Sequence, residues 1–188
     1  MTIDVAFCEL AASDREAVLD LMRAYYAEDG HEFSQDRAAA AIDEIISGNA
    51  LARLWLIQGS GDVVGYVCIT LGFSLEVGGS DFFLDELFVV PEARGQGVGR
   101  AALDFIEEES RNLGARRICL KVGLHNAAAR EIYSARQCHE HDRHLMSKWL
   151  KGSGRPSSRT RKYLFGRGPG PGHGCRGSLP ACSPPPYS

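Results

Sequence analysis

The feature that most constrains this chain is the junction at residues 85–100 (DELFVVPEARGQGVGR), where an apolar run breaks at a proline and continues as a basic, glycine-rich loop. Residues 87–90 have the β-branched and aromatic character of a strand, and residues 101–113 carry apolar side chains at helical spacing. Because glycine has no Cβ, the backbone N–H groups of the loop can approach a ligand at the positive end of the helix dipole. Arg94 and Arg100 add full positive charges. The junction therefore predicts a phosphate site between a strand and a helix.

The spacing of the glycines excludes two familiar phosphate loops. A Walker-type loop requires a Gly-Lys-Ser/Thr sequence that is absent here, and a dinucleotide fingerprint requires a glycine where this chain has Arg100. The remaining pattern is Arg94-x-x-Gly97-x-Gly99, preceded by a strand and a Pro91-Glu92 turn. It resembles the acetyl-CoA pyrophosphate loop of the GCN5-related N-acetyltransferase (GNAT) superfamily. A glycine-rich turn that only caps a helix is the alternative interpretation.

The predicted order of elements extends this resemblance over about residues 3–150. We expect strands and helices over the following ranges: strand 3–10, a helix from Ser13 or Asp14, a helix from Ser34, strands 51–58, 63–73 and 82–90, helix 101–113, strand 116–122, helix 126–135 and an end strand over 145–150. This order resembles that of the GNAT acyl-CoA acyltransferase fold. The resemblance implies an α/β fold with a mixed, strongly twisted sheet flanked by helices, and acetyl-CoA bound where the glycine-loop strand and the next strand diverge.

A second motif follows the glycine loop, in residues 125–133 (HNAAAREIY). It is similar to the Asn-x-x-Ala…Tyr pattern of the same superfamily. The resemblance implies that Asn126 caps a helix and contacts the cofactor, and that the Tyr133 hydroxyl protonates the departing thiolate. A tyrosine suits this task because it keeps its proton until a strong base develops nearby. The alternative is a core aromatic residue, and the usual Gly-Phe after this tyrosine is replaced here by Gln137 and Cys138.

Acetyl transfer to an amine requires a polarised thioester, a deprotonated amine and a proton for the leaving thiol. The resemblance assigns the first task to backbone N–H groups at residues 87–89, acting as oxyanion donors. Asp85 and Glu86 are the nearest acids for the second task, and because neighbouring strand residues face opposite ways, we expect only one to face the thioester. Resemblance to polyamine acetyltransferases favours Asp85, although carboxylates without chemistry remain the alternative.

These interpretations define three groups of expected site residues. The catalytic group is Tyr133, Asp85 and Glu86. The cofactor group is Leu87, Phe88, Val89, Arg94, Gly95, Gln96, Gly97, Val98, Gly99, Arg100 and Asn126. Family topology adds an acceptor group of Tyr25, Tyr26, His31, Phe33 and Glu76.

Charge divides the chain into two predicted parts, an N-acetyltransferase domain over 1–150 and a low-complexity, disordered tail over 151–188. The tail contains seven Lys or Arg and no acid, so the net charge of -3 for the whole chain leaves -10 for the domain. An acidic domain favours a small cationic amine as substrate and disfavours nucleic acid. Glycine and proline dominate the tail, which has too few apolar residues to offset its ordering entropy.

The remaining sequence features exclude several other classes of protein. No apolar run reaches the length of a membrane span and no signal peptide precedes the domain, so we expect a cytoplasmic protein without membrane contact. Six scattered cysteines are expected to be reduced thiols. The cluster formed by Cys138, His139, His141 and His144 lacks a second ligand pair at metal spacing, which favours a solvated hairpin over zinc. No metal is expected.

The predicted function is an N-acetyltransferase that uses acetyl-CoA as co-substrate and a primary amine as acceptor. A small cationic amine is the favoured acceptor, and a protein N-terminus or lysine is an alternative. A non-catalytic acyl-CoA-binding module with a regulatory role is the alternative from another class. The sequence leaves the oligomeric state open, with a homodimer among the options.

Overall fold

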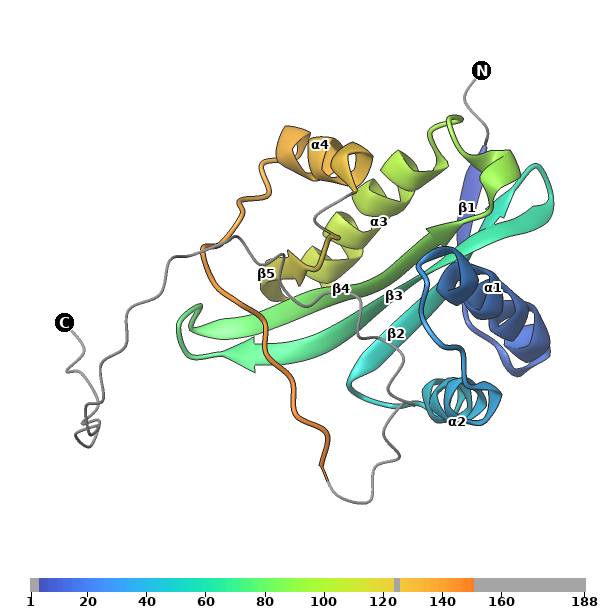
Figure 1. Cartoon of the computed structure of the whole chain (residues 1–188), viewed down its shortest axis with the longest axis horizontal. Helices are drawn as coiled ribbons and strands as arrows, with labels where there is room; N and C mark the ends of the chain where they lie inside the picture. The colour runs from blue at the N-terminus through green and yellow to red at the C-terminus, as the bar shows by residue number, and fades with distance from the viewer. Residues whose placement is uncertain (1–3, 124–125, 151–188) are drawn as a thin grey trace, which may run out of the picture. The chain divides into compact units, whose positions relative to one another are not determined.

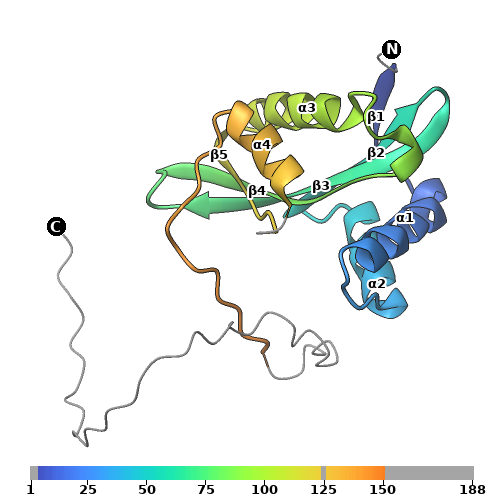
Figure 2. The same ribbon diagram turned by 45° about the horizontal axis from the view of Figure 1, so that its top comes forward.

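The computed structural model describes residues 4–123 and 126–150, which form one twisted sheet with helices on both faces (Figures 1 and 2). The strands are β1 (Val5–Glu9), β2 (Ala52–Gly59), β3 (Asp62–Ser74), β4 (Gly79–Val89) and β5 (Ala115–Leu120). They lie side by side in chain order; β1 to β4 pair antiparallel, and β5 pairs parallel to β4. The mixed α/β sheet predicted from the sequence is confirmed.

Four α-helices cover the sheet: α1 (Arg15–Glu28), α2 (Gln35–Ile46), α3 (Val98–Asn112) and α4 (Ala127–Ala135). Figure 2 shows α3 and α4 on one face and α1 and α2 on the other. Each face has its own core, since Leu19, Ile42 and Tyr66 belong to a buried cluster under α1 and α2, whereas Val67, Leu103 and Ile106 belong to a cluster under α3. Alternation along β3 therefore sends Tyr66 and Val67 to opposite layers.

Local signals place most helix ends close to the expected residues. Ser34 precedes α2, and Gly48 after the helix has a φ of 89°, in the left-handed region where glycine is favoured. Two short 3₁₀ turns, Ala12–Asp14 and Pro91–Ala93, precede α1 and the glycine loop. On α2, Ala38 and Ile42 are buried against the sheet, whereas Ala41 is exposed.

The end strand predicted over residues 145–150 is wrong. Within the described part of the chain this segment forms no strand, and the exposed fractions of Met146 and Trp149 are 89% and 50%. Alternating apolar residues form a strand only when another strand supplies hydrogen-bonding partners, and in the described structure β5 pairs with β4 alone. The predicted tail over 151–188 lies outside the described residues.

Candidate active site

The site begins where β4 and β5 separate. The two strands pair from Ser80 and Ala115 up to Leu84 and Leu120, and β4 then continues to Val89. On its other side β4 stays paired with β3 as far as Val89. The last five residues of β4 therefore have one edge that faces no strand among the described residues. We call residues 85–89 the unpaired end of β4.

A β-bulge at the start of this segment changes which way its side chains face. Cys68 of β3 pairs with Glu86, but the next residue, Ile69, pairs with Leu84, so Asp85 is the extra residue. As a result Leu84 packs in the cluster under α3, whereas Phe88 packs in the cluster under α1 and α2.

The bulge removes the reason for the expectation that Asp85 and Glu86 face opposite ways, and the charges of both act on the same two neighbouring groups. Burial raises the pKa of the Cys68 thiol to about 12, and the charges of both carboxylates add to that rise. Both charges likewise raise the pKa of Tyr25, again with burial as the main cause. Simple alternation fails here because the extra residue interrupts the period of two.

Glu86 is half-buried between two tyrosines. Tyr26 of α1 donates to its Oε1 at 2.8 Å, and Tyr66 of β3 donates to its Oε2 at 2.6 Å. Burial raises the pKa of the Glu86 carboxyl, and the two hydroxyls oppose that rise because they stabilise the carboxylate. Burial, followed by the charge of Glu86, raises the pKa of both hydroxyls as well, so they remain donors at neutral pH.

Asp85 has a different environment from Glu86. Its side chain is exposed, and its Oδ1 lies 4.0 Å from Nζ of Lys121, which follows β5. Lys121 also lies over the ring of Phe83, with its Nζ 5.1 Å from the ring centroid. Neither Tyr66 nor Lys121 was among the expected site residues. One signal in the sequence points to Tyr66 as a site residue: it is a tyrosine, with a polar hydroxyl, in the otherwise apolar run VVGYVCI.

The glycine loop leads directly into α3. Gly95 and Gly97 have φ values of 73° and 89°, and α3 begins at Val98, three residues before the expected start. The first helical bond runs from Ala101 N to Gly97 O, so the preceding N–H groups lie at the open end of the helix. The space beside both Gly95 and Gly99 is open, because a Cβ atom at either position would have no atom outside its immediate chain neighbours within 4 Å. The loop thus combines unpaired donors with open space, as an anion site requires.

Other loop side chains are used to build the loop itself. Val98 is buried in a cluster with Ala93 and Ala102. The amide of Gln96 donates to the Glu92 carbonyl at 2.9 Å. The exposed Arg100 contributes its carbonyl as an acceptor for the side chain of Arg136, the residue after α4, at 3.1 Å.

Arg94 connects the loop to α1. Its guanidinium donates to both carboxylate oxygens of Glu28, at 2.9 and 2.6 Å, and to the carbonyl of Val89 at 2.8 Å. It also lies over the ring of Phe88, with its Cζ 5.7 Å from the ring centroid. The predicted cofactor arginine therefore bonds to the last turn of α1 and to the unpaired end of β4 in this structure.

Asn126 caps α4, as predicted, because its side-chain oxygen accepts from the backbone N–H of Ala129 at 3.0 Å. Tyr133 on the same helix is half-buried against the cluster under α3. Burial raises the pKa of its hydroxyl, and a nearby Cys138 adds to that rise. The two expected roles of Tyr133, acid and core aromatic, are both compatible with this position.

Four of the five expected acceptor residues lie together at the end of α1. The ring centroid of Tyr26 lies 5.6 Å from that of Tyr25, 6.3 Å from His31 and 5.8 Å from Phe33. Glu76 does not join them: it lies in the turn between β3 and β4, where its charge acts on Arg117 and Cys119 of β5. Its assignment to this group is wrong, because β3 and β4 extend as a long hairpin that carries the turn away from α1 (Figure 1).

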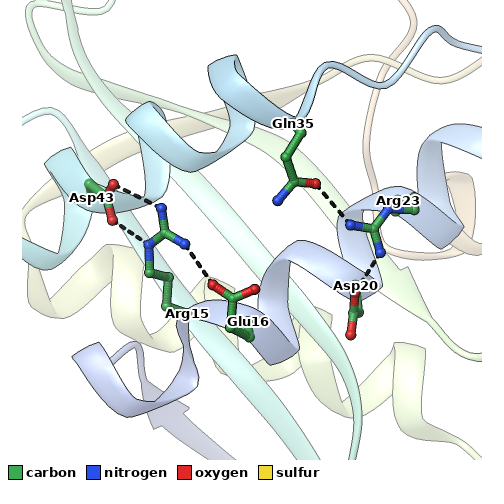
Figure 3. A network of polar contacts seen from close by, with 6 residues as sticks. All are labelled: Arg15, Glu16, Asp20, Arg23, Gln35 and Asp43. Carbon is green, nitrogen blue, oxygen red and sulfur yellow. Dashed lines mark hydrogen bonds and ion pairs between the residues drawn. The ribbon is translucent and has the colours of Figure 1, made fainter.

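Polar contacts fix α1 against α2 and so position these aromatic residues (Figure 3). Arg15 donates to both oxygens of Asp43, at 2.7 and 3.0 Å. Further along α1, Arg23 donates to the Gln35 side chain at 2.8 Å. These contacts are exposed, so they orient the helices more than they stabilise the fold.

Two further features can be stated for residues 4–123 and 126–150. No three His, Cys, Asp or Glu side chains in this part of the chain are placed to share a metal ion. No helix in it has the length and apolar character to cross a membrane.

Comparison with known proteins agrees with this architecture. The sequence model of the acetyltransferase (GNAT) family matches residues 15–139. A Bacillus subtilis (strain 168) protein named as an uncharacterized N-acetyltransferase, YhfO, is 27% identical over 121 residues, which cover 64% of this chain and 80% of that protein. A solved integron cassette protein from the mobile metagenome of Cole Harbour Salt Marsh is 32% identical, with a TM-score of 0.69, and the match covers 80% of this chain and 91% of that one.

A more distant structure shares the fold alone. The aminoglycoside N-acetyltransferase AAC(6')-Iy, solved in complex with CoA, has a TM-score of 0.67 at 15% identity, covering 79% of this chain and 97% of that one. The family match spans most of the chain and includes the glycine loop, the unpaired end of β4 and α4. This chain therefore belongs to the acetyltransferase (GNAT) family.

Proposed function

We propose that this protein transfers an acetyl group from acetyl-CoA to a primary amine. The observation that carries the proposal is the separation of β4 from β5 after Leu84, in the same strand that carries the carboxylates and ends at the glycine loop. This one strand end joins an anion site, an unpaired backbone edge and two acids. An acyl-CoA thioester and an amine need these three groups near one another.

The residues present suit acetyl-CoA. The N–H groups at the start of α3 suit its pyrophosphate, because they are unpaired and the space around Gly95 and Gly99 is open. The unpaired end of β4 offers backbone donors at Leu87, Phe88 and Val89 to the thioester arm and its carbonyl oxygen. Asn126 caps α4 and Tyr133 lies on it, and this helix follows β5, the strand that separates from β4.

The chemistry divides between the two sides of this opening. An amine at neutral pH is mostly protonated, so Asp85 or Glu86 must take its proton, directly or through water, before the nitrogen can form the new C–N bond. As the C–S bond breaks, Tyr133 supplies a proton to the sulfur. Of the two acids, Glu86 is favoured by its half-buried position, because Asp85 is exposed and has Lys121 as a neighbour.

A small cationic amine is the favoured acceptor. The net charge of -10 over residues 1–150 attracts cations, and Glu86 lies beside the aromatic residues at the end of α1. Two structural relatives are named as an aminoglycoside N-acetyltransferase and a ribosomal-protein-alanine N-acetyltransferase. At 15% and 17% identity they share the fold with this chain and leave both small and protein acceptors open. The charge of this chain is what favours the former.

The test is thiol release from acetyl-CoA with a panel of acceptors. The panel contains an alkylamine, a polyamine, an aminoglycoside and two peptides, one with a lysine and one with a free N-terminal alanine. We expect release above the blank with at least one small cationic amine. A protein that binds acetyl-CoA by calorimetry but releases no thiol with any acceptor would be a binding module, and the proposal would fail.

A further inference from the structure

Glu86 is half-buried and forms no ion pair with another described residue. Among the ion pairs of the described residues, Lys121 pairs with Asp85 and Arg94 pairs with Glu28. Within the same part of the chain, its two oxygens accept from the neutral hydroxyls of Tyr26 and Tyr66. Removing a charge from water is costly unless another charge or several hydrogen bonds compensate it. Burial disfavours the charge of Glu86, the two hydroxyls oppose that effect, and no cation among the described residues forms an ion pair with it.

The groups around Glu86 come from every neighbouring element. Tyr66 and Cys68 face it from β3, Tyr25 and Tyr26 from α1, Asp85 from β4 and Lys121 from the residue after β5. The tyrosines and the thiol are neutral at pH 7, because burial raises the pKa of each of them. Lys121 offsets the charge of Asp85 across 4.0 Å. Lys121 also favours the charged form of Glu86, but among the described residues it forms an ion pair with Asp85 and not with Glu86.

The two tyrosines occupy different kinds of position. Tyr66 is fully buried in the central strand β3, with an exposed fraction of 0%. Tyr26 is half-buried near the end of α1 and contacts His31 and Phe33 in the segment between α1 and α2. The hydroxyl from β3 therefore anchors Glu86 to the sheet, and the hydroxyl from α1 connects it to the aromatic residues that border the acceptor side.

We propose that Tyr26 and Tyr66 are positioning residues that hold Glu86 as a carboxylate next to the unpaired end of β4, and that this carboxylate binds the ammonium group of the acceptor. The proposal rests on the proposed function and adds to it the two hydroxyl groups that position Glu86 for the amine. An ammonium supplies a positive charge that no described residue places in an ion pair with Glu86. Because an ammonium and a carboxylate are both charged, they bind more strongly than an alcohol of the same shape binds the carboxylate.

The first measurement is made on the free, full-length protein and does not depend on activity. Carbon-13 NMR of labelled glutamate side chains, with the Glu86 signal assigned by its loss in Glu86→Gln, gives the pKa of Glu86 directly. In Tyr66→Phe and in Tyr26→Phe the carboxylate loses a donor, so we expect its pKa to rise by about one unit. Tyr25→Phe is the matched control. Among the described residues Tyr25 makes ring contacts but no hydrogen bond with Glu86, so its loss should shift that pKa by a few tenths at most.

The second measurement uses n-butylammonium chloride and n-butanol as probes. The ammonium should shift the Glu86 signal of the wild-type protein, and the alcohol should not. With the best amine of the panel, Tyr66→Phe should raise the KM for the amine by up to about tenfold on the acidic side of the measured Glu86 titration, because a higher pKa leaves more of the carboxyl protonated there. The difference should shrink as the pH rises above the Glu86 pKa of both proteins. A residue with only a structural role would not produce this pH dependence.

Two results would overturn the proposal: an unchanged Glu86 pKa in both tyrosine variants, or an equal response of the Glu86 signal to the alcohol and the ammonium. If Tyr66→Phe does not fold, Tyr26→Phe provides the same test from the less buried side. The pKa and probe measurements need no acetyl transfer. Failure of the proposed function, seen as no thiol release by the wild-type protein, can therefore be distinguished from failure of this inference.

Discussion

At the scale of single residues, Tyr133 is where packing and chemistry are hardest to separate. The ring packs against the cluster under α3, which supports a structural role. Burial raises the pKa of the hydroxyl, so it keeps its proton at neutral pH, as a general acid must. Removing the hydroxyl while keeping the ring separates the two roles.

We predict that Tyr133→Phe lowers kcat with the best amine by about 100-fold and leaves acetyl-CoA affinity close to wild type. The reason is that the ring still packs, but the proton for the leaving thiol is gone. Thiol release and calorimetry measure the two quantities. Unchanged turnover would make Tyr133 a core residue. Ile132→Ala on the same helix is a control, because this neighbouring side chain is 45% exposed and has no proton that it could donate to the thiol.

At the scale of elements, the start of α3 provides a direct test of the cofactor site. The φ of 89° at Gly97 would strain any substitution there, so loss of binding in a Gly97 variant could come from a damaged loop. Gly99 lies in the first turn of α3, and a side chain there meets open space. Gly99 is therefore the better position.

Gly99→Val should weaken acetyl-CoA binding by about tenfold or more without lowering thermal stability, since glycine is a poor helix former. Its side chain would extend into the space assigned to the pyrophosphate. Gly99→Ala, with a single methyl group, should have a smaller effect, and calorimetric titration of both variants measures it. Wild-type affinity in a folded Gly99→Val protein would remove the glycine loop from the cofactor site.

The contact between β4 and β5 gives a prediction for pH. Asp81 of β4 accepts two hydrogen bonds from Arg117, its partner on β5, at 2.9 and 2.8 Å, and the guanidinium lowers the pKa of the carboxyl. Because the folded pKa lies below the unfolded one, the stabilisation is present above about pH 4 and is lost as the pH falls through the folded value.

Asp81→Asn should therefore melt at a lower temperature than wild type between about pH 5 and pH 8, well above the pKa of roughly 3.9 of a free Asp. The difference should disappear in more acidic solution. Thermal denaturation followed by circular dichroism at several pH values provides the measurement. Asp62→Asn, at an exposed position in the β2–β3 hairpin, is the control and should keep the wild-type dependence on pH. A stability difference for Asp81→Asn that is the same at acidic and neutral pH would exclude the ion pair as its source.

At the scale of the whole molecule, the question is where the functional unit ends. The described helices and strands end at Ala135, the buried clusters include no residue beyond Tyr133, and the family match ends at residue 139. A domain over residues 1–150 remains our prediction, and truncation tests it.

Deletion of residues 153–188 should leave the melting temperature and the acetyl-CoA affinity unchanged within experimental error at physiological salt. The deletion removes six of the seven basic residues beyond residue 150, and at this ionic strength charges more than about 8 Å apart are largely screened. Calorimetry of the full and truncated chains provides both numbers. A truncated protein that unfolds, or that binds acetyl-CoA but loses activity, would move the domain boundary towards the C-terminus.

The sequence by itself determined the local features of this protein: the glycine loop that opens α3, the hairpin between β2 and β3, the cap of Asn126 on α4 and the order of elements up to that helix. These depend on neighbouring residues, whose turn preferences, caps and apolar spacing are written in a short window. Membership in the acetyltransferase family followed from the same local motifs, and the family match confirms it.

The tertiary structure decided what depends on pairing between distant segments. The bulge at Asp85 arises from the register of β4 against β3, and it turns Glu86 towards Tyr26 and Tyr66, which lie 60 and 20 residues away in sequence. The same holds for residues 145–150, whose apolar character suggested a strand although the described structure gives them no partner strand. A strand's register and the face of each side chain are set by the strand beside it, so no local pattern could reveal them.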